Sequence, residues 1–125
     1  MNKNKIDNLI PKAYEAIQKT GIARDDKINS AYRGQISRFG AAVSMGSLLS
    51  AIAFFKDQGG ASVDRTKLIG AMAMVLGKPD LYTYVLETAI KPKDKNAEMK
   101  CREEILEAAI ALKLAMNLFV LEGEG

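Results

Sequence analysis

The spacing of apolar residues is the feature that most limits the fold of this chain. Apolar side chains recur at steps of three and four along nearly the whole sequence, and sustained alternation of apolar and polar residues is hard to find. The first spacing places apolar side chains on one face of an α-helix, whereas alternation is typical of a half-buried β-strand. The sequence therefore predicts an all-α protein, and a length of 125 residues predicts a single domain.

Helix-ending and helix-starting residues divide the chain into a compact bundle of about six helices. Glycine is expected to end the first four of them, at Thr20-Gly21, Gly46, Gly59-Gly60 and Gly77. Ser62 is expected to begin the fourth and Pro79 to take the first position of the fifth. Pro11 fits the first turn of the first helix or marks a later start. The predicted helices cover residues 7–19, 25–45, 47–58, 63–76, 79–90 and a last stretch from 94 or 96 to 121.

Composition argues against several classes of protein. Hydrophobic residues make up 48% of the chain, which is too many for a disordered chain with a net charge of only +3. Cys101 is the single cysteine, so an internal disulfide is excluded and a reducing compartment is favoured. The N-terminus is polar, and the longest weakly charged run, residues 39–55, is interrupted by serine and glycine. We therefore expect a soluble, cytoplasmic protein without a signal peptide.

The chain contains no histidine. This removes the commonest general base, and with one cysteine it excludes a zinc site of the usual ligands within the chain. Glu103, Glu104 and Glu107 cluster on the last predicted helix, but the neighbouring Lys100 and Arg102 favour a solvated charged face over cation binding. We therefore expect no enzymatic activity, no metal and no cofactor.

The segment AYRGQISRFG, residues 31–40, places two arginines and two glycines within a predicted helix. Projected at about 100° per residue, Lys27, Gly34 and Arg38 align on one stripe. Glycine within a helix costs roughly 0.5–1 kcal/mol relative to alanine, so a close approach of another backbone is expected here. Two explanations stay open: tight packing within the bundle, or contact of a basic stripe with a polyanion. A separate face carries the apolar residues Ile28, Tyr32, Ile36, Phe39 and Val43.

The last predicted helix is apolar on every side near its end. This character begins at Leu114 and includes Ala115, Leu118, Val120 and Leu121. Because a small domain cannot easily enclose its terminal helix completely, this end is expected either to lie unusually centrally or to contact another subunit.

Three segments, in this order and at this spacing, resemble the small-subunit family of the type III-B CRISPR Cmr (RAMP module) effector complex. They are SAYRGQISRFGAAVSMGSLLSAIAFF, DRTKLIGAMAMVL and LYTYVLE, and the opening NLIPKAYEAI is also similar to the start of that family. The resemblance covers most of the chain. The positions that match are Ser30, Tyr32, Arg33, Gly34, Phe39, Gly46, Leu48, Leu49, Ala53, Phe54, Arg65, Lys67 and Leu68.

The resemblance implies a non-catalytic helical subunit of an RNA-targeting ribonucleoprotein in antiviral defence. Several copies of such a subunit stack into a minor filament beside the backbone subunits that hold the guide RNA. Basic side chains then line the path of the target RNA, and phosphate contacts position a strand without reading its sequence. The implied partners are the other Cmr subunits, further copies of this chain and the guide–target RNA duplex, mainly its target strand.

Seven basic residues are candidates for RNA contact: Arg24, Lys27, Arg33, Arg38, Lys56, Arg65 and Lys67. Arg24, Lys27 and Arg38 lie on or beside the predicted stripe. Arg33 and Arg65 occupy family positions, and Lys56 and Lys67 qualify if the third and fourth helices pack alongside. Any of them could instead be a solubilising charge, and Arg65 could pair with Asp57 or Asp64. The alternative function is a stand-alone adaptor or regulator that binds a protein through its apolar last helix.

Overall fold

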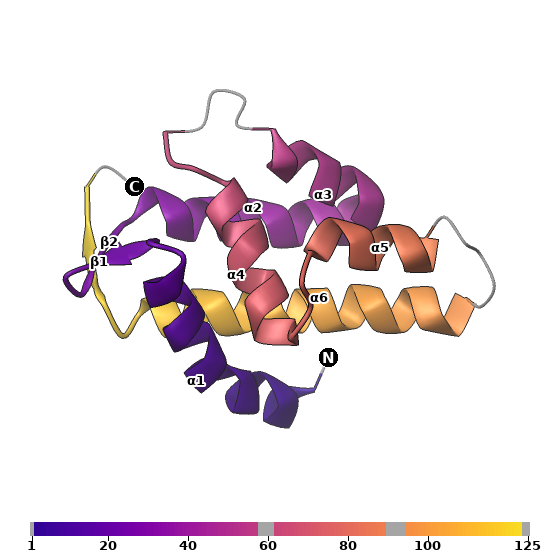
Figure 1. Cartoon of the computed structure of the whole chain (residues 1–125), viewed down its shortest axis with the longest axis horizontal. Coiled ribbons are helices and arrows are strands. Elements are labelled where there is room, and N and C mark those ends of the chain that lie inside the picture. The colour runs from indigo at the N-terminus through magenta and orange to yellow at the C-terminus, as the bar shows by residue number, and fades with distance from the viewer. Residues whose placement is uncertain (1, 58–61, 90–94, 124–125) are drawn as a thin grey trace.

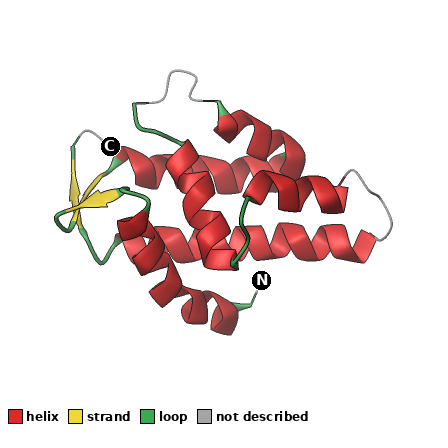
Figure 2. Cartoon of the chain, viewed as in Figure 1, coloured by secondary structure: helices red, strands yellow, loops and turns green. Residues whose placement is uncertain are grey.

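The structure, a computed structural model, describes residues 2–57, 62–89 and 95–123. Within these ranges the chain forms a mostly helical bundle, as predicted, together with a small three-stranded sheet at one end (Figures 1 and 2). In chain order the elements are α1 (Lys3–Lys19), β1 (Ala23–Arg24), β2 (Lys27–Asn29), α2 (Ala31–Met45), α3 (Leu48–Lys56), α4 (Thr66–Leu76), α5 (Leu81–Ala89), α6 (Lys95–Met116) and β3 (Val120–Glu122).

Helix α6 is the element around which the bundle packs. It contacts α1, α2, α4 and α5, and it runs along the long axis of the molecule (Figure 1). Ile105, Leu112 and Met116 on this helix are fully buried. Alanines at 108, 111 and 115 are also fully buried, and their small side chains let the neighbouring helices approach closely. The core is therefore centred on the part of α6 that ends at Met116. The end that was expected either to be central or to contact another subunit is not central, since Leu114, Leu118 and Val120 are exposed.

Helix α1 begins earlier than the sequence indicates and runs through Pro11. The Asn2 side chain accepts a hydrogen bond from the Lys5 N–H at 3.2 Å and so caps the helix. Both Pro11 and Asp7, whose carbonyl loses its helical partner, lie on the exposed side. Water can satisfy that carbonyl, which explains why proline is tolerated inside this helix.

Aspartate side chains accept hydrogen bonds from backbone N–H groups at the starts of α4 and α5. Asp64 Oδ1 accepts the N–H of the residue two positions on at 3.0 Å, and Asp80 Oδ2 accepts the N–H three positions on at 3.1 Å. The predicted roles of Ser62 and Pro79 are therefore wrong, because α4 begins only at Thr66, with Arg65 at its N-cap position, and α5 begins only at Leu81.

The predicted glycine stops are confirmed wherever they are described. Gly21 and Gly77 adopt left-handed φ angles of 79° and 68°, and Gly46 follows the last residue of α2. The predicted stop at residues 59–60 lies outside the described residues, as does residue 90, where the fifth helix was expected to end.

Residues 23–29 form a β-hairpin instead of the predicted start of the second helix. Ala23 pairs with Ile28 and Arg24 with Lys27 in an antiparallel register. The two aspartates between them have positive φ angles of 52° and 64°, which a two-residue hairpin turn requires and which aspartate tolerates. Helix α2 therefore begins at residue 31, after the hairpin.

The chain after α6 turns into strand β3 and pairs in parallel with β2. The Val120 N–H donates to the Asp26 carbonyl at 2.9 Å, and the Ser30 N–H donates to the Glu122 carbonyl. A helix to residue 121 was expected, and this expectation is wrong because the backbone of β2 offers a competing set of hydrogen-bond partners. Leu118 and Val120 remain 64% and 57% exposed, so the apolar character at this end belongs to a turn and a strand.

Candidate nucleic-acid interface

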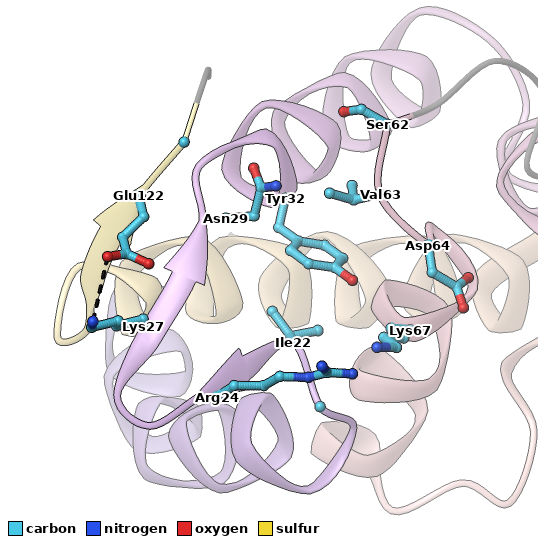
Figure 3. A pocket seen from close by; sticks show the side chains of 12 residues that line it. Ile22, Arg24, Lys27, Asn29, Tyr32, Ser62, Val63, Asp64, Lys67 and Glu122 are labelled. Atoms are coloured by element: carbon cyan, nitrogen blue, oxygen red, sulfur yellow. Dashed lines mark ion pairs between the residues drawn. The ribbon is translucent and has the colours of Figure 1, made fainter.

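An open pocket of about 640 Å³ lies beside the sheet (Figure 3). Its walls come from the β-hairpin, the start of α2, the segment before α4, the first turn of α4 and the end of β3. Three of the seven candidate basic residues line it, namely Arg24, Lys27 and Lys67. The fold thus brings together Arg24 and Lys67, which are 43 positions apart in the sequence. Lys67 belongs to α4 and not to the helix that was expected to carry the basic stripe.

The side chains of Arg24 and Lys67 extend into the same space from two elements (Figure 3). Lys67 Nζ lies 3.5 Å from where a Cβ atom of residue 21 would be, which is an ordinary van der Waals distance, so glycine is required here by its φ angle of +79° and not by space. Among the described residues, neither Arg24 nor Lys67 forms an ion pair with a carboxylate. Their charges therefore remain available to an anion that enters the pocket.

Tyr32 supplies a neutral hydroxyl to this space. Its side chain is almost entirely buried, and Figure 3 shows its oxygen directed toward the side of the pocket where Asp64 and Lys67 lie. Burial raises the pKa of the Tyr32 phenol and the charge of Asp64 raises it further, whereas a hydrogen bond with the Asp64 backbone and the charge of Arg24 act in the opposite direction. The hydroxyl is thus protonated at neutral pH and can donate or accept a hydrogen bond.

Lys27 lies at the rim of the pocket and is partly neutralised. Its Nζ lies 3.6 Å from Glu122 Oε2, and both side chains are more than half exposed. Because Lys27 belongs to β2, it does not align with Gly34 and Arg38 on one helix, and the predicted basic stripe is wrong. Arg38 is exposed on α2 and does not line the pocket.

Arg33 and Lys56 each contact a neighbouring element elsewhere in the bundle. Arg33 Nε donates to Asn117 Oδ1 at 3.1 Å and so links α2 to the turn after α6. Lys56 Nζ lies 4.3 Å from the ring centre of Tyr82, a cation–π contact that joins α3 to α5. Neither residue lines the pocket, so the structure does not group them with Arg24 and Lys67.

Arg65 is buried, and the predicted role in RNA contact is wrong for this residue. Only 5% of it is exposed, and its Nη2 donates to the backbone carbonyls of Phe54 and Asp57. The guanidinium also lies 4.4 Å from the ring centre of Phe54 and 5.1 Å from that of Phe55. Arg65 therefore fastens the end of α3 to the start of α4.

Glu107 is also buried, in contrast to the expected solvated face. It is 2% exposed, and its Oε2 accepts the backbone N–H of Asn2 at 3.0 Å. Arg102 on the same helix donates to the carbonyls of Val43 and Ser44 at the end of α2. Both side chains therefore form hydrogen bonds with backbone groups near the ends of other helices. Within the described ranges, no group of three carboxylate or cysteine side chains could hold a metal ion.

The two glycines of α2 are not explained by packing within the chain. Within the part of the chain that the structure describes, a Cβ atom added to Gly34 or Gly40 would meet no atom within 4 Å beyond its own helix backbone. The explanation from tight helix packing inside the bundle is therefore wrong, and both positions present bare backbone to the surroundings.

We expect Gly34→Ala to raise the free energy of unfolding of the isolated protein by about 0.5–1 kcal/mol, because alanine loses less backbone entropy in a helix and meets no obstacle here. Urea denaturation followed by circular dichroism measures this change. Gly21→Ala is the matched control and should be destabilising, since φ at residue 21 is +79°. Destabilisation by Gly34→Ala would mean that the helix packs more tightly at this position than described.

None of the helices in the described ranges has the length and apolar character needed to cross a membrane. Comparison of the chain with protein-family models, with curated proteins and with solved structures found no match.

Proposed function

We propose that this chain is a non-catalytic small subunit of a type III-B CRISPR Cmr complex and that it holds phosphates of the target RNA with Arg24 and Lys67. The observation that carries the proposal is the convergence of these two side chains in one open pocket, without an ion pair to a described carboxylate. The resemblance of residues 30–55, 64–76 and 81–87 to the Cmr small-subunit family supports the choice of complex.

Phosphate binding of this kind is independent of base sequence. Lysine and arginine side chains that neutralise phosphates release condensed counterions, which makes the affinity fall as salt rises. The pocket holds three basic and two acidic side chains, so its net charge is only about +1. A single copy therefore offers weak binding, and several copies along one RNA strand would add their contacts.

Exposed apolar side chains support contact with neighbouring subunits or with further copies of the chain. Leu118 and Val120 lie at one end of the molecule, and Met45 at the end of α2 is 89% exposed. The same residues favour the second candidate function, an adaptor that binds a protein partner by apolar contact. The dependence of binding affinity on salt distinguishes the two candidate functions. The affinity of an apolar contact changes little between low and moderate ionic strength, whereas that of a phosphate contact falls steeply.

The test is the RNA affinity of a reconstituted complex that carries Arg24→Ala and Lys67→Ala in this subunit. We expect the affinity for target RNA to fall and the slope of log affinity against log salt to decrease by about 2, close to 1 for each phosphate contact. Lys95→Ala with Lys100→Ala is the matched control, since both residues lie at the start of α6, far from the sheet (Figure 1). An unchanged slope in the pocket variant would contradict the proposal.

A further inference from the structure

The pocket is larger than a phosphate-binding site requires. Its volume of about 640 Å³ falls within the range that encloses whole small molecules. A phosphate group held by Arg24 and Lys67 would leave most of this space unfilled. The size therefore points to a ligand that continues beyond its phosphate.

The lining also contains acidic and apolar groups, which do not interact favourably with a phosphate ion. The carboxylates of Asp64 and Glu122 repel an anion, and both already have partners within the chain: Asp64 Oδ1 accepts the Thr66 N–H, and Glu122 Oε2 lies 3.6 Å from Lys27 Nζ. Val63 adds apolar surface to the same pocket, whereas Ile22 is only 3% exposed. A ligand that fits this lining has an anionic part and an apolar part.

The two kinds of group are separated in the pocket. In Figure 3, Arg24 and Lys67 lie on one side, and Asn29 and Val63 lie on the other, with Tyr32 between them. The Oδ1 atom of Asn29 accepts the Ala31 N–H at 2.9 Å, which leaves its amide nitrogen to donate to a ligand. An extended ligand can therefore place its phosphate at one side and a hydrogen-bond acceptor at the other.

We propose that this pocket binds one complete ribonucleotide, with the phosphate at Arg24 and Lys67 and the nucleoside against Asn29 and Val63. This rests on the proposed function and deepens it, because the ligand becomes a nucleotide unit and not the phosphate chain alone. The same chemistry is offered by a nucleotide turned out of a stacked RNA strand and by a free mononucleotide.

The first experiment titrates the isolated full-length chain with inorganic phosphate, ribose 5-phosphate and each of the four 5′-ribonucleotides. We expect the best nucleotide to bind at least about tenfold more tightly than phosphate, with ribose 5-phosphate between them, and Arg24→Ala with Lys67→Ala to weaken all of them. Equal affinity for nucleotides and phosphate would overturn the inference and leave the proposed phosphate contact standing. Nucleotide binding that survives the double substitution would also overturn it.

A steric variant tests the nucleoside side separately. Ser62 is exposed and lines the pocket, so Ser62→Leu fills space without removing a cation. We expect it to abolish the preference for nucleotide over phosphate, whereas Ser44→Leu, at an exposed site outside this pocket, should preserve it. A preference unaffected by Ser62→Leu would place the nucleoside elsewhere and overturn the inference.

The second experiment distinguishes the two sources of the nucleotide. The reconstituted complex is given target RNA with its bases or with abasic ribose units at successive positions. A loss of affinity at particular abasic positions, absent in the Ser62→Leu complex, assigns the pocket to a nucleotide of the strand. Unchanged affinity for abasic RNA, together with tight mononucleotide binding by the isolated chain, assigns it to a free nucleotide.

Discussion

Replacing Phe39 with alanine is expected to lower the free energy of unfolding by about 3–5 kcal/mol. Phe39 is fully buried on α2, and its ring meets that of Phe55 on α3 edge to face, with ring centres 5.2 Å apart. The substitution removes a large apolar side chain and leaves a cavity between two helices that cannot collapse completely. Urea denaturation of the isolated protein, followed by circular dichroism, measures the change.

The control for this substitution is Met45→Ala on the same helix. Met45 is 89% exposed, so its truncation should change the free energy of unfolding by no more than about 0.5 kcal/mol. A loss below about 1 kcal/mol for Phe39→Ala would show that the contact between α2 and α3 is looser than the described packing.

Replacing Arg65 with alanine is expected to lower the free energy of unfolding by about 2–4 kcal/mol. The substitution removes the hydrogen bonds to the carbonyls of Phe54 and Asp57 and the contacts with two aromatic rings. Lysine should restore only part of this loss, because an ammonium group cannot reproduce the planar contacts of a guanidinium. The same denaturation assay applies.

Arg38→Ala is the matched control for Arg65→Ala, since Arg38 is exposed and is expected to contribute little to stability. The RNA affinity of complexes assembled with folded Arg65→Ala protein should equal that of the unsubstituted complex. A stable Arg65→Ala protein with reduced RNA affinity would contradict the structural role of Arg65 and restore it as an RNA contact.

Much of the helical part of the fold could be predicted from the sequence because its signals are local. The predicted core residues Tyr32, Ile36, Phe39 and Val43 are all buried, and they share one face of α2. A glycine that ends a helix is also a local signal, because it can be recognised from the few residues around it. The strands could not be predicted by periodicity, because two or three residues are too few to show alternation.

The candidate site was predicted only in part. Arg24, Lys27 and Lys67 do gather at one place, but through the hairpin and α4 instead of a stripe on one helix. The sequence did contain one local signal for the hairpin, namely the two consecutive aspartates at residues 25–26, which form the turn between the two strands. The burial of Arg65 and Glu107 had no local signal in the sequence. It follows from contacts between segments that are distant in the sequence, such as that of Asn2 with Glu107.

The parallel pairing of β3 with β2 makes the pocket depend on the last described strand. Glu122 and Gly123 form one wall of the pocket and follow all six described helices in the sequence. Truncation after α6 would therefore remove this wall and leave the helical segments of the core intact.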